Sequence, residues 1–293
     1  MITVGGIIVF ITYTTYILAP LSTVFNIFFI LAGIKPSYER LNIFFNAEEE
    51  NVGEKKNADE IYSIDINNVT FSYQDLDVFA NVSFKIRKNQ KIIIFGKNGC
   101  GKTTMINLLL RLENKAGGLI QINEKDINLI NIEEYRKKIA TALTDCYLFN
   151  DTIINNICIN NSVDYGRLEE VIEICLLDKI IDEKGKDYSI GDNGEFLSAG
   201  QRQKICIARA LVSDRKFMIL DEPTTNLDIE SKNRIISYIF SIDKTVLIIS
   251  HDKDILPNAD KIVYLKDGVV NDEGGFNALM NRNIYFKQEV YEV

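Results

Sequence analysis

The 293-residue chain lacks several features that would indicate particular classes of function. Its 33 basic residues are outnumbered by 41 acidic ones, and the net charge of −8 argues against a surface that coats nucleic acid. It has no internal repeat at solenoid periods and no low-complexity tract. Its odd number of cysteines includes no CxxC pair, so we expect reduced thiols in the cytosol, with neither a disulfide framework nor a zinc site: Cys100, Cys146, Cys158, Cys175 and Cys206.

Charge is also missing from the first 34 residues, which contain no acidic or basic side chain. A helix needs roughly 20 apolar residues to cross a bilayer, so this stretch is long enough to span one. A signal peptide would have basic residues before its apolar stretch, whereas here Lys35 and Arg40 follow it and favour a cytoplasmic carboxyl end. A buried core helix is the alternative. Polar residues within the stretch are typical of a helix that contacts other helices: Thr12, Thr14, Thr15, Ser22 and Asn26.

The remaining chain divides into a linker and a folded domain. Helical spacing of apolar residues continues to Asn46, which predicts that residues 1–46 form the membrane helix and a cytoplasmic extension. Residues 47–60, AEEENVGEKKNADE, are charged and aperiodic, as expected of a solvated linker. Residues 61–293 then form the domain that carries the chemistry.

A phosphate-binding loop stands at Gly96–Thr104, GKNGCGKTT, between an apolar strand and a helix. Its glycines let backbone N–H groups point at phosphate oxygens at the positive end of that helix. Lys102 should reach the outer phosphates, and the Thr103 hydroxyl should bind magnesium. We expect the whole stretch to contact a nucleotide: Gly96, Lys97, Asn98, Gly99, Cys100, Gly101, Lys102, Thr103 and Thr104.

Two further apolar strands end in polar residues that suit phosphate hydrolysis. Asp221 follows the strand KFMIL and should hold magnesium through water, while Glu222 should orient and deprotonate an attacking water. His251, the single histidine, follows TVLIIS and should donate to the terminal phosphate from the same sheet edge. The alternatives are an ordinary helix start for the acidic pair and an uninformative lone histidine.

The stretch LSAGQ, Leu197–Gln201, begins a predicted helix and has no acid or metal ligand. Ser198 is a natural N-cap and Gly200 permits close backbone approach. This pattern is consistent with a capped helix alone, or with a second anion site whose free N–H groups meet a phosphate.

Taken together, these motifs resemble the ATP-binding cassette family over essentially the whole chain. LSAGQ is similar to that family's signature, which closes over ATP held by the partner subunit's loop. The resemblance implies Thr225–Asp228 as D-loop, Tyr73 as the aromatic that stacks on adenine, and Ser198, Gly200 and Gln201 as contacts to the partner's ATP. It implies an α/β P-loop cassette with a mixed central sheet, an antiparallel β subdomain and a helical subdomain near 145–213, all preceded by a transmembrane helix.

Segments outside these motifs resemble the exporter branch, namely Tyr147–Ile157, Ile190–Gln203 and the apolar start of the chain. The chain is similar to the carboxyl-terminal part of a transporter half, with the last transmembrane helix and one cassette. The resemblance implies ATP and Mg²⁺ as cofactors and a site at the cell membrane with the cassette in the cytoplasm. It implies as partners a second cassette in a homo- or heterodimer, an exporter's other helices, and membrane lipid, with no nucleic acid.

Thr144 departs from the family pattern, since a glutamine that reaches magnesium and the attacking water usually stands there. Thr is shorter, so we expect a competent ATP hydrolase with slow turnover or weakened coupling. Ala199 and Asp192 are milder departures. The alternatives are a truncated ATP-binding remnant without transport activity and a soluble cassette ATPase.

Overall fold

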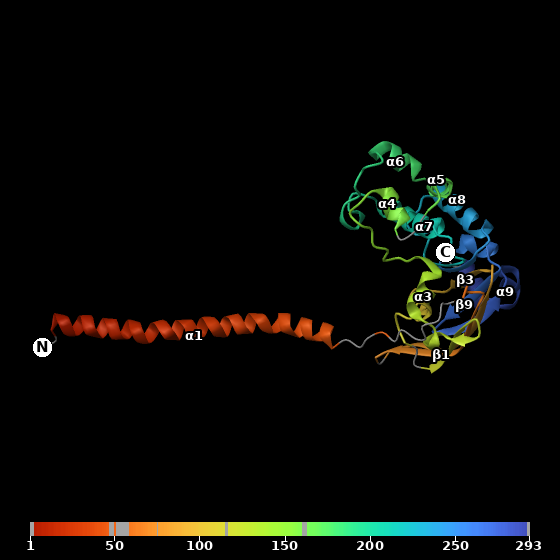
Figure 1. The fold of residues 1–293 in the computed structure, drawn as a ribbon. Coiled ribbons are helices and arrows are strands. Elements are labelled where there is room, and N and C mark those ends of the chain that lie inside the picture. The colour runs from red at the N-terminus through yellow and green to blue at the C-terminus, as the bar shows by residue number, and fades with distance from the viewer. Residues whose placement is uncertain are drawn as a thin grey trace. The chain divides into compact units, whose positions relative to one another are not determined.

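The computed structural model describes residues 3–46, 50, 59–74, 76–114, 117–159 and 163–291. The chain forms two compact units, Met1–Asn51 and Val52–Val293 (Figure 1). The linker predicted at 47–60 falls almost entirely outside the described residues. Its assignment therefore stays a prediction.

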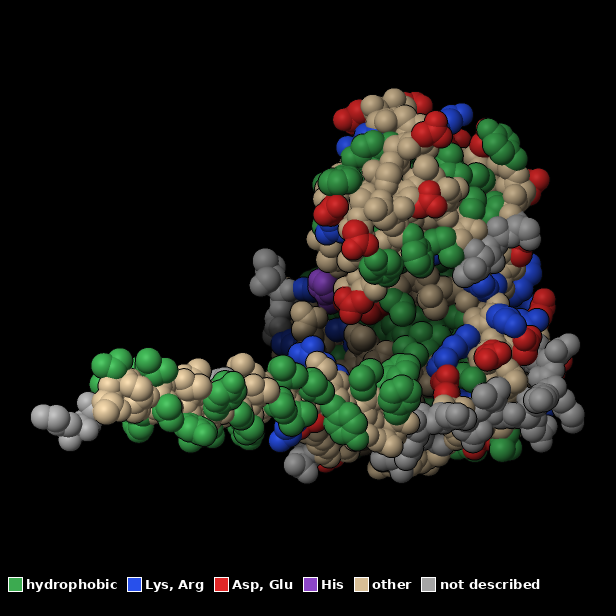
Figure 2. All heavy atoms as spheres, turned by 60° about the vertical axis from the view of Figure 1, so that its left-hand side comes forward, with side chains coloured by type: hydrophobic (Ala, Val, Ile, Leu, Met, Phe, Trp, Pro, Cys, Tyr) green, Lys and Arg blue, Asp and Glu red, His purple; other side chains and the backbone are tan. Residues whose placement is uncertain are grey.

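The first unit is one helix, α1, from Val4 to Phe45. The Thr3 hydroxyl caps its start by accepting a hydrogen bond from the Gly6 N–H at 3.3 Å. Threonine hydroxyls inside the helix are satisfied locally; that of Thr14, for example, donates to the Phe10 carbonyl at 2.7 Å. Apolar side chains cover the helix, as the visible face in Figure 2 shows. In the part of the chain that the structure describes, α1 is the one helix whose length and composition suffice to cross a membrane. The Ser22 side chain lies outside the described residues.

The second unit begins with an antiparallel sheet in the strand order β2-β1-β4-β5. Alternate residues of β1 are buried, because one face of this sheet packs on the core while the other meets solvent. The strands are β1 (Ser63–Tyr73), β2 (Leu76–Arg87), β4 (Gly117–Ile122) and β5 (Lys125–Asp126).

A second sheet forms the centre of the unit, in the order β10-β9-β3-β8-β7-β6. Its strands run parallel except β10, which pairs antiparallel with β9. The apolar strands β3, β7 and β8 are buried throughout, as expected of strands covered on both faces. The strands are β3 (Lys91–Phe95), β6 (Ile139–Ala142), β7 (Phe217–Asp221), β8 (Thr245–Ser250), β9 (Lys261–Lys266) and β10 (Val269–Gly274).

Helices group into a subdomain at one end of the unit, with the others around the central sheet (Figure 1). The helical subdomain contains α4 (Ile153–Cys158), α5 (Tyr165–Ile174), α6 (Asp178–Lys184) and α7 (Ala199–Val212). The other α-helices are α2 (Lys102–Leu109), α3 (Ile132–Lys137), α8 (Ile229–Ser241), α9 (Phe276–Arg282) and α10 (Ile284–Tyr291). Short 3₁₀ turns cover Ile127–Leu129, Asp192–Gly194 and Lys253–Asn258.

The expectation that all five cysteines are free thiols is wrong for one pair. Cys146, in the loop after β6, and Cys206, on α7, form a disulfide across 60 residues of sequence. The fold brings this loop against α7, a contact that no cysteine spacing signalled. Cys100, Cys158 and Cys175 are free.

Candidate functional site

The loop Gly96–Thr104 curls directly after β3 and ends where α2 begins. Its conformation requires glycine at several positions. A Cβ on Gly96 would lie 2.1 Å from the Leu265 carbonyl oxygen, and Gly101 has a φ of +99° with the Phe79 ring 2.5 Å from a built Cβ. Only glycine tolerates both the left-handed conformation and these contacts. The loop is thus shaped by close packing on the backbone of β9 and on side chains of β2.

Lys102 lies inside this loop, with 6% of its surface exposed. Its ammonium donates to the carbonyls of Gly96 at 2.7 Å and Lys97 at 3.0 Å, so the loop wraps around a positive charge. The start of α2 adds N–H groups without internal partners. A cation and free N–H groups in one cradle fit a phosphate chain. Thr103, at the start of α2, is exposed.

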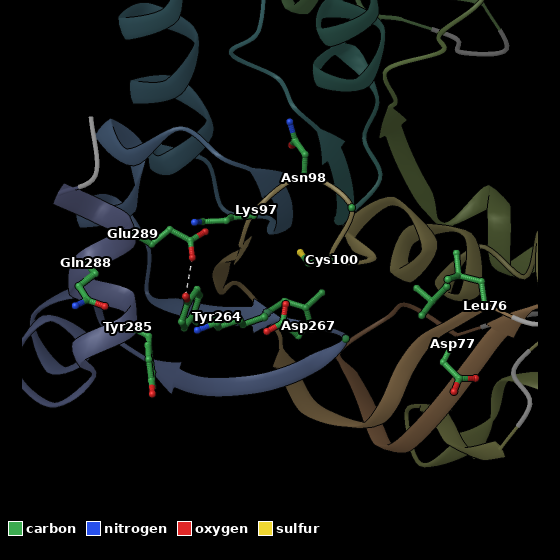
Figure 3. Close-up of a pocket in the computed structure, with 15 residues that line it drawn as sticks. Leu76, Asp77, Lys97, Asn98, Cys100, Tyr264, Asp267, Tyr285, Gln288 and Glu289 are labelled. Atoms are coloured by element: carbon green, nitrogen blue, oxygen red, sulfur yellow. Dashed lines mark hydrogen bonds between the residues drawn. The ribbon is translucent and has the colours of Figure 1, made fainter.

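A cavity of about 550 Å³ flanks the loop (Figure 3). Its wall opposite the loop comes from the β9–β10 turn and from α10. There the Tyr264 hydroxyl donates to Glu289 Oε2 at 2.6 Å, and Lys266 Nζ lies 3.9 Å from the Tyr285 ring centroid. Tyr73 does not line this cavity. It is 39% exposed at the end of β1, with its ring edge-on to Phe71 at 4.7 Å between centroids.

The acidic pair lies where β7 ends, at the carboxyl edge of the sheet. Asp221 is 5% exposed, and burial raises the pKa of its carboxyl, while a hydrogen bond with Thr144 acts in the opposite direction. Glu222 turns sharply with a φ of +48°, and its N–H donates to the Ile249 carbonyl at 2.8 Å. This turn sends its side chain toward the end of β8, where Oε2 lies 2.8 Å from His251 Nδ1.

A cleft of about 330 Å³ brings these residues together; it is lined by Asn98, Thr144, Gln203, Asp221, Glu222 and His251, among others. The space-filling view shows the histidine (purple) at the surface with acidic side chains beside it (Figure 2). Magnesium in nucleotide sites is held by one or two carboxylates plus phosphate and hydroxyl oxygens. Asp221 with nearby threonine hydroxyls fits that donor set, although Thr103 does not line the cleft. No group of three or more histidine, cysteine or acidic side chains forms a metal cluster among the described residues.

The signature stretch begins α7 with a capping box. Ser198 Oγ accepts from the Gln201 N–H at 3.2 Å, and Gln201 Oε1 accepts from the Ser198 N–H at 2.9 Å. Gly200 is required by a neighbour in the same chain, because a Cβ there would lie 2.4 Å from the Asn226 carbonyl oxygen. These residues line their own hollow, together with Lys204 and Asp228, and no residue of Gly96–Thr104 borders it.

Gln203 links α7 to the turns at Glu222 and Asn226, a role that no sequence motif indicated. Its side-chain amide donates to the Glu222 carbonyl at 2.7 Å and accepts from the Asn226 amide at 3.4 Å. Gln203 lies three residues after Gly200 on α7, so the helical period alone placed both on one face. α7 thus fixes the turn that aims Glu222.

The family model described as ABC transporter matches residues 79–225. The chain belongs to the ABC transporter family. The relatives it matches include the ATP-dependent lipid A-core flippase of Shigella sonnei (strain Ss046), 33% identical over 263 residues, which are 86% of this chain and 45% of the relative. The flippase of Escherichia coli (strain K12) is 33% identical over 262 residues with the same coverage.

A solved structure, that of a bacterial Atm1-family ABC exporter with ATP bound, superposes with a TM-score of 0.78 at 25% identity. The superposition covers 98% of this chain and 52% of that one. The chain spans about half the length of these relatives. The predicted cassette fold and the resemblance to exporters are confirmed, and the cassette is an ATP-binding component of transporter type. The roles of individual site residues stay predictions.

Proposed function

We propose that this chain is the ATP-hydrolysing part of an ABC exporter, in which two cassettes close head to tail around ATP. One observation carries the proposal: the signature residues Ser198, Gly200 and Gln201 line a hollow that no residue of the chain's own phosphate loop borders. A helix start that is exposed and separate from its own loop suits a phosphate supplied by another subunit. ATP then stabilises the closed pair, because both subunits contact it only when closed.

In this proposal the residues that bind and hydrolyse ATP lie at the carboxyl ends of the three strands β3, β7 and β8. Lys102 and the loop N–H groups bind the phosphates, and Asp221 with Thr103 would hold Mg²⁺, which would neutralise charge on the phosphate oxygens. Glu222 orients a water and accepts its proton. Since Nδ1 of His251 faces Glu222 at 2.8 Å, the other ring nitrogen is left for the terminal phosphate.

Tyr73 stacks on adenine from the end of β1 in this proposal. Its exposed ring at the hairpin, held edge-on by Phe71, supports that role.

The N-terminal part serves as the last transmembrane helix of the exporter half, with residues 1–46 as helix and extension, 47–60 as linker and 61–293 as cassette. Its uniformly exposed apolar surface and its charge-free length support a span that contacts lipid and other helices. The cassette then lies in the cytoplasm. Membrane pellets test this directly: release of the chain by salt alone would contradict a spanning helix, and release only by detergent would support it.

Hydrolysis is tested by MgATPase measurements on the full chain in detergent, over a wide range of protein concentration, with Glu222→Gln as the blank. Specific activity that rises with concentration and is absent in the variant supports the head-to-tail pair. Activity independent of concentration would contradict it.

Thr144, at the position where the family usually has a glutamine, favours a second candidate, a cassette that binds ATP with weak hydrolysis beside a more active partner in a heterodimer. In that case the full chain binds ATP in equilibrium dialysis but hydrolyses it at the rate of the Glu222→Gln blank. Added partner cassette would then restore hydrolysis.

A further inference from the structure

Two cysteines from different parts of the cassette meet beside the cleft. Cys146 lies two residues after Thr144 in the loop that leaves β6, and Cys206 lies five residues after Gln201 on α7. Their Cα atoms are 6.3 Å apart, within the range of roughly 4.4–6.8 Å that a disulfide bridges without backbone movement. Both residues line the cleft that contains Asp221 and Glu222.

The two sulfur atoms differ in accessibility and charge environment. Cys206 is 6% exposed, whereas Cys146 is half-buried. The Arg209 guanidinium, one turn further along α7, donates to Cys146 Sγ at 3.4 Å. A positive charge beside a sulfur favours the thiolate, which is the reactive form. Cys146 is therefore placed to attack, and Cys206 to resolve the mixed disulfide.

The other cysteines lack this setting. Burial raises the pKa of the Cys175 thiol to about 12, and burial also raises the pKa of Cys158 and of Cys100. Raised thiol pKa values leave little thiolate near neutral pH. The chain thus contains one dithiol built for exchange and three thiols that are not.

We propose that Cys146 and Cys206 form a reversible redox pair that, when oxidised, ties the Thr144 loop to the signature helix and slows ATP hydrolysis. The inference rests on the proposed ATPase function. Thr144 lines the cleft with Asp221 from the loop side, and Gln203 donates to the Glu222 carbonyl from the α7 side. A covalent bond between these two elements fixes the width of the cleft at the two acids. The phosphate loop follows β3 and is not crossed by this bond, so the oxidised chain still binds ATP, with an affinity that the fixed cleft lowers.

The exchange balances with a low-molecular-weight disulfide such as oxidised glutathione as oxidant. The Cys146 thiolate attacks one glutathione sulfur, and the first glutathione thiolate leaves. The Cys206 thiolate then attacks Cys146 Sγ, and the second glutathione thiolate leaves. The protein gives up two electrons and two protons, and the glutathione disulfide becomes two glutathione molecules.

The first experiment oxidises the full chain in detergent with oxidised glutathione, maps disulfide-linked peptides by mass spectrometry, and measures MgATPase activity before and after dithiothreitol. We expect a 146–206 linkage, a roughly tenfold lower kcat, and recovery on reduction. Absence of that linkage, or the linkage with an unchanged rate, would overturn the proposal.

Variants separate this pair from the other thiols. Because replacement of the buried Cys206 risks misfolding, the test uses Cys146→Ser, with Cys158→Ser as the matched control on the same subdomain. Each variant's oxidised rate is compared with its own reduced rate. The ATPase rate of Cys146→Ser should no longer fall on oxidation, whereas the rate of Cys158→Ser should still fall. Equal sensitivity in Cys146→Ser would assign the effect to another thiol, with Cys100 in the phosphate loop as the first to check.

A binding measurement tests the pair without hydrolysis. In glutathione buffers of fixed ratio, the oxidised fraction of Glu222→Gln is measured with and without MgATP, and bound ATP is measured in the same samples. Since coupling is reciprocal, ATP should shift the dithiol–disulfide equilibrium by about threefold or more. If ATP binds and the equilibrium does not shift, the proposed redox pair is overturned and the ATPase function is not. If ATP does not bind, both proposals are overturned.

Discussion

His251 Nδ1 lies 2.8 Å from Glu222 Oε2, across the ends of the adjacent parallel strands β7 and β8. The histidine backbone N–H also points at the same oxygen, at 3.4 Å. Glu222 reaches this position only because its own backbone adopts a φ of +48°. The pair is therefore set by strand register and a strained turn, and it holds the carboxylate in one orientation.

Replacement Glu222→Gln should lower kcat by about 10³-fold, because the amide cannot accept the proton of the attacking water. ATP should still bind, since the loop and Lys102 are unchanged. The variant should then form a stable dimer in MgATP by light scattering. A monomer in excess MgATP would contradict the head-to-tail model.

His251→Ala should lower kcat by about 10²-fold with a small change in KM, because the ring positions the base and contacts the phosphate only during reaction. Lys253→Ala, two residues on, is the matched control and should stay close to the unsubstituted rate. A change in KM alone would indicate that the ring serves binding and not the reaction.

Thr144→Val keeps the side-chain shape and removes the hydroxyl that lowers the pKa of the Asp221 carboxyl in the shared cleft. We expect a several-fold higher Mg²⁺ concentration for half-maximal ATPase, because the carboxylate loses an orienting partner. Thr144→Gln, which restores the side chain usual in the family, should raise kcat. A faster Thr144→Val enzyme would show that the hydroxyl restrains Asp221 unproductively.

Gly200→Ala should destabilise the cassette by about 1–3 kcal/mol, since its Cβ would meet the Asn226 carbonyl at 2.4 Å and backbone cannot move aside cheaply. Ala199→Gly, the neighbouring exposed position, should cost less than about 1 kcal/mol. Thermal unfolding followed by circular dichroism compares them. Similar Tm values for both variants would show that α7 and the Asn226 turn can separate freely.

The buried Lys244 should make the stability of the cassette depend on pH in the alkaline range. Burial lowers the pKa of its ammonium to about 8, against an ordinary 10.5, while its Nζ donates to the Ser213 carbonyl. Between these values the unfolded chain binds more protons, so the free energy of unfolding from this group rises with pH from about 8 to 10.5. Denaturant unfolding should show this rise in the unsubstituted chain and lose it in Lys244→Met. The exposed Lys186→Met, which removes a lysine that does not act on Lys244, should retain it.

The sequence predicted three of the six strands of the central sheet, because these three are short, continuous apolar runs. The phosphate loop follows β3, Asp221 ends β7 and His251 follows β8. Parallel strands of one sheet present their carboxyl ends at one edge, which is why the loop, Asp221 and His251 could be grouped in advance.

Contacts between distant segments were out of reach of such patterns. The contacts between Gln203 and Glu222 and between Cys146 and Cys206 depend on how α7 packs across the sheet. A single residue in the sequence does not indicate which distant residue it will contact. The same holds for the wall of the cavity that α10 supplies through Tyr264 and Glu289. The family resemblance implied the antiparallel subdomain, but the contact of its strand β2 with Gly101 was not predictable.

The capping box at the start of α7 affects how quickly the two cassettes dissociate after hydrolysis. Ser198 and Gln201 already satisfy each other, so an arriving phosphate exchanges one set of hydrogen bonds for another. Such an exchange is worth only about 1 kcal/mol per bond. Because each hydrogen bond between α7 and the phosphate contributes so little, the two cassettes separate readily once the phosphate leaves. The next cycle then begins without a large free-energy barrier to dissociation.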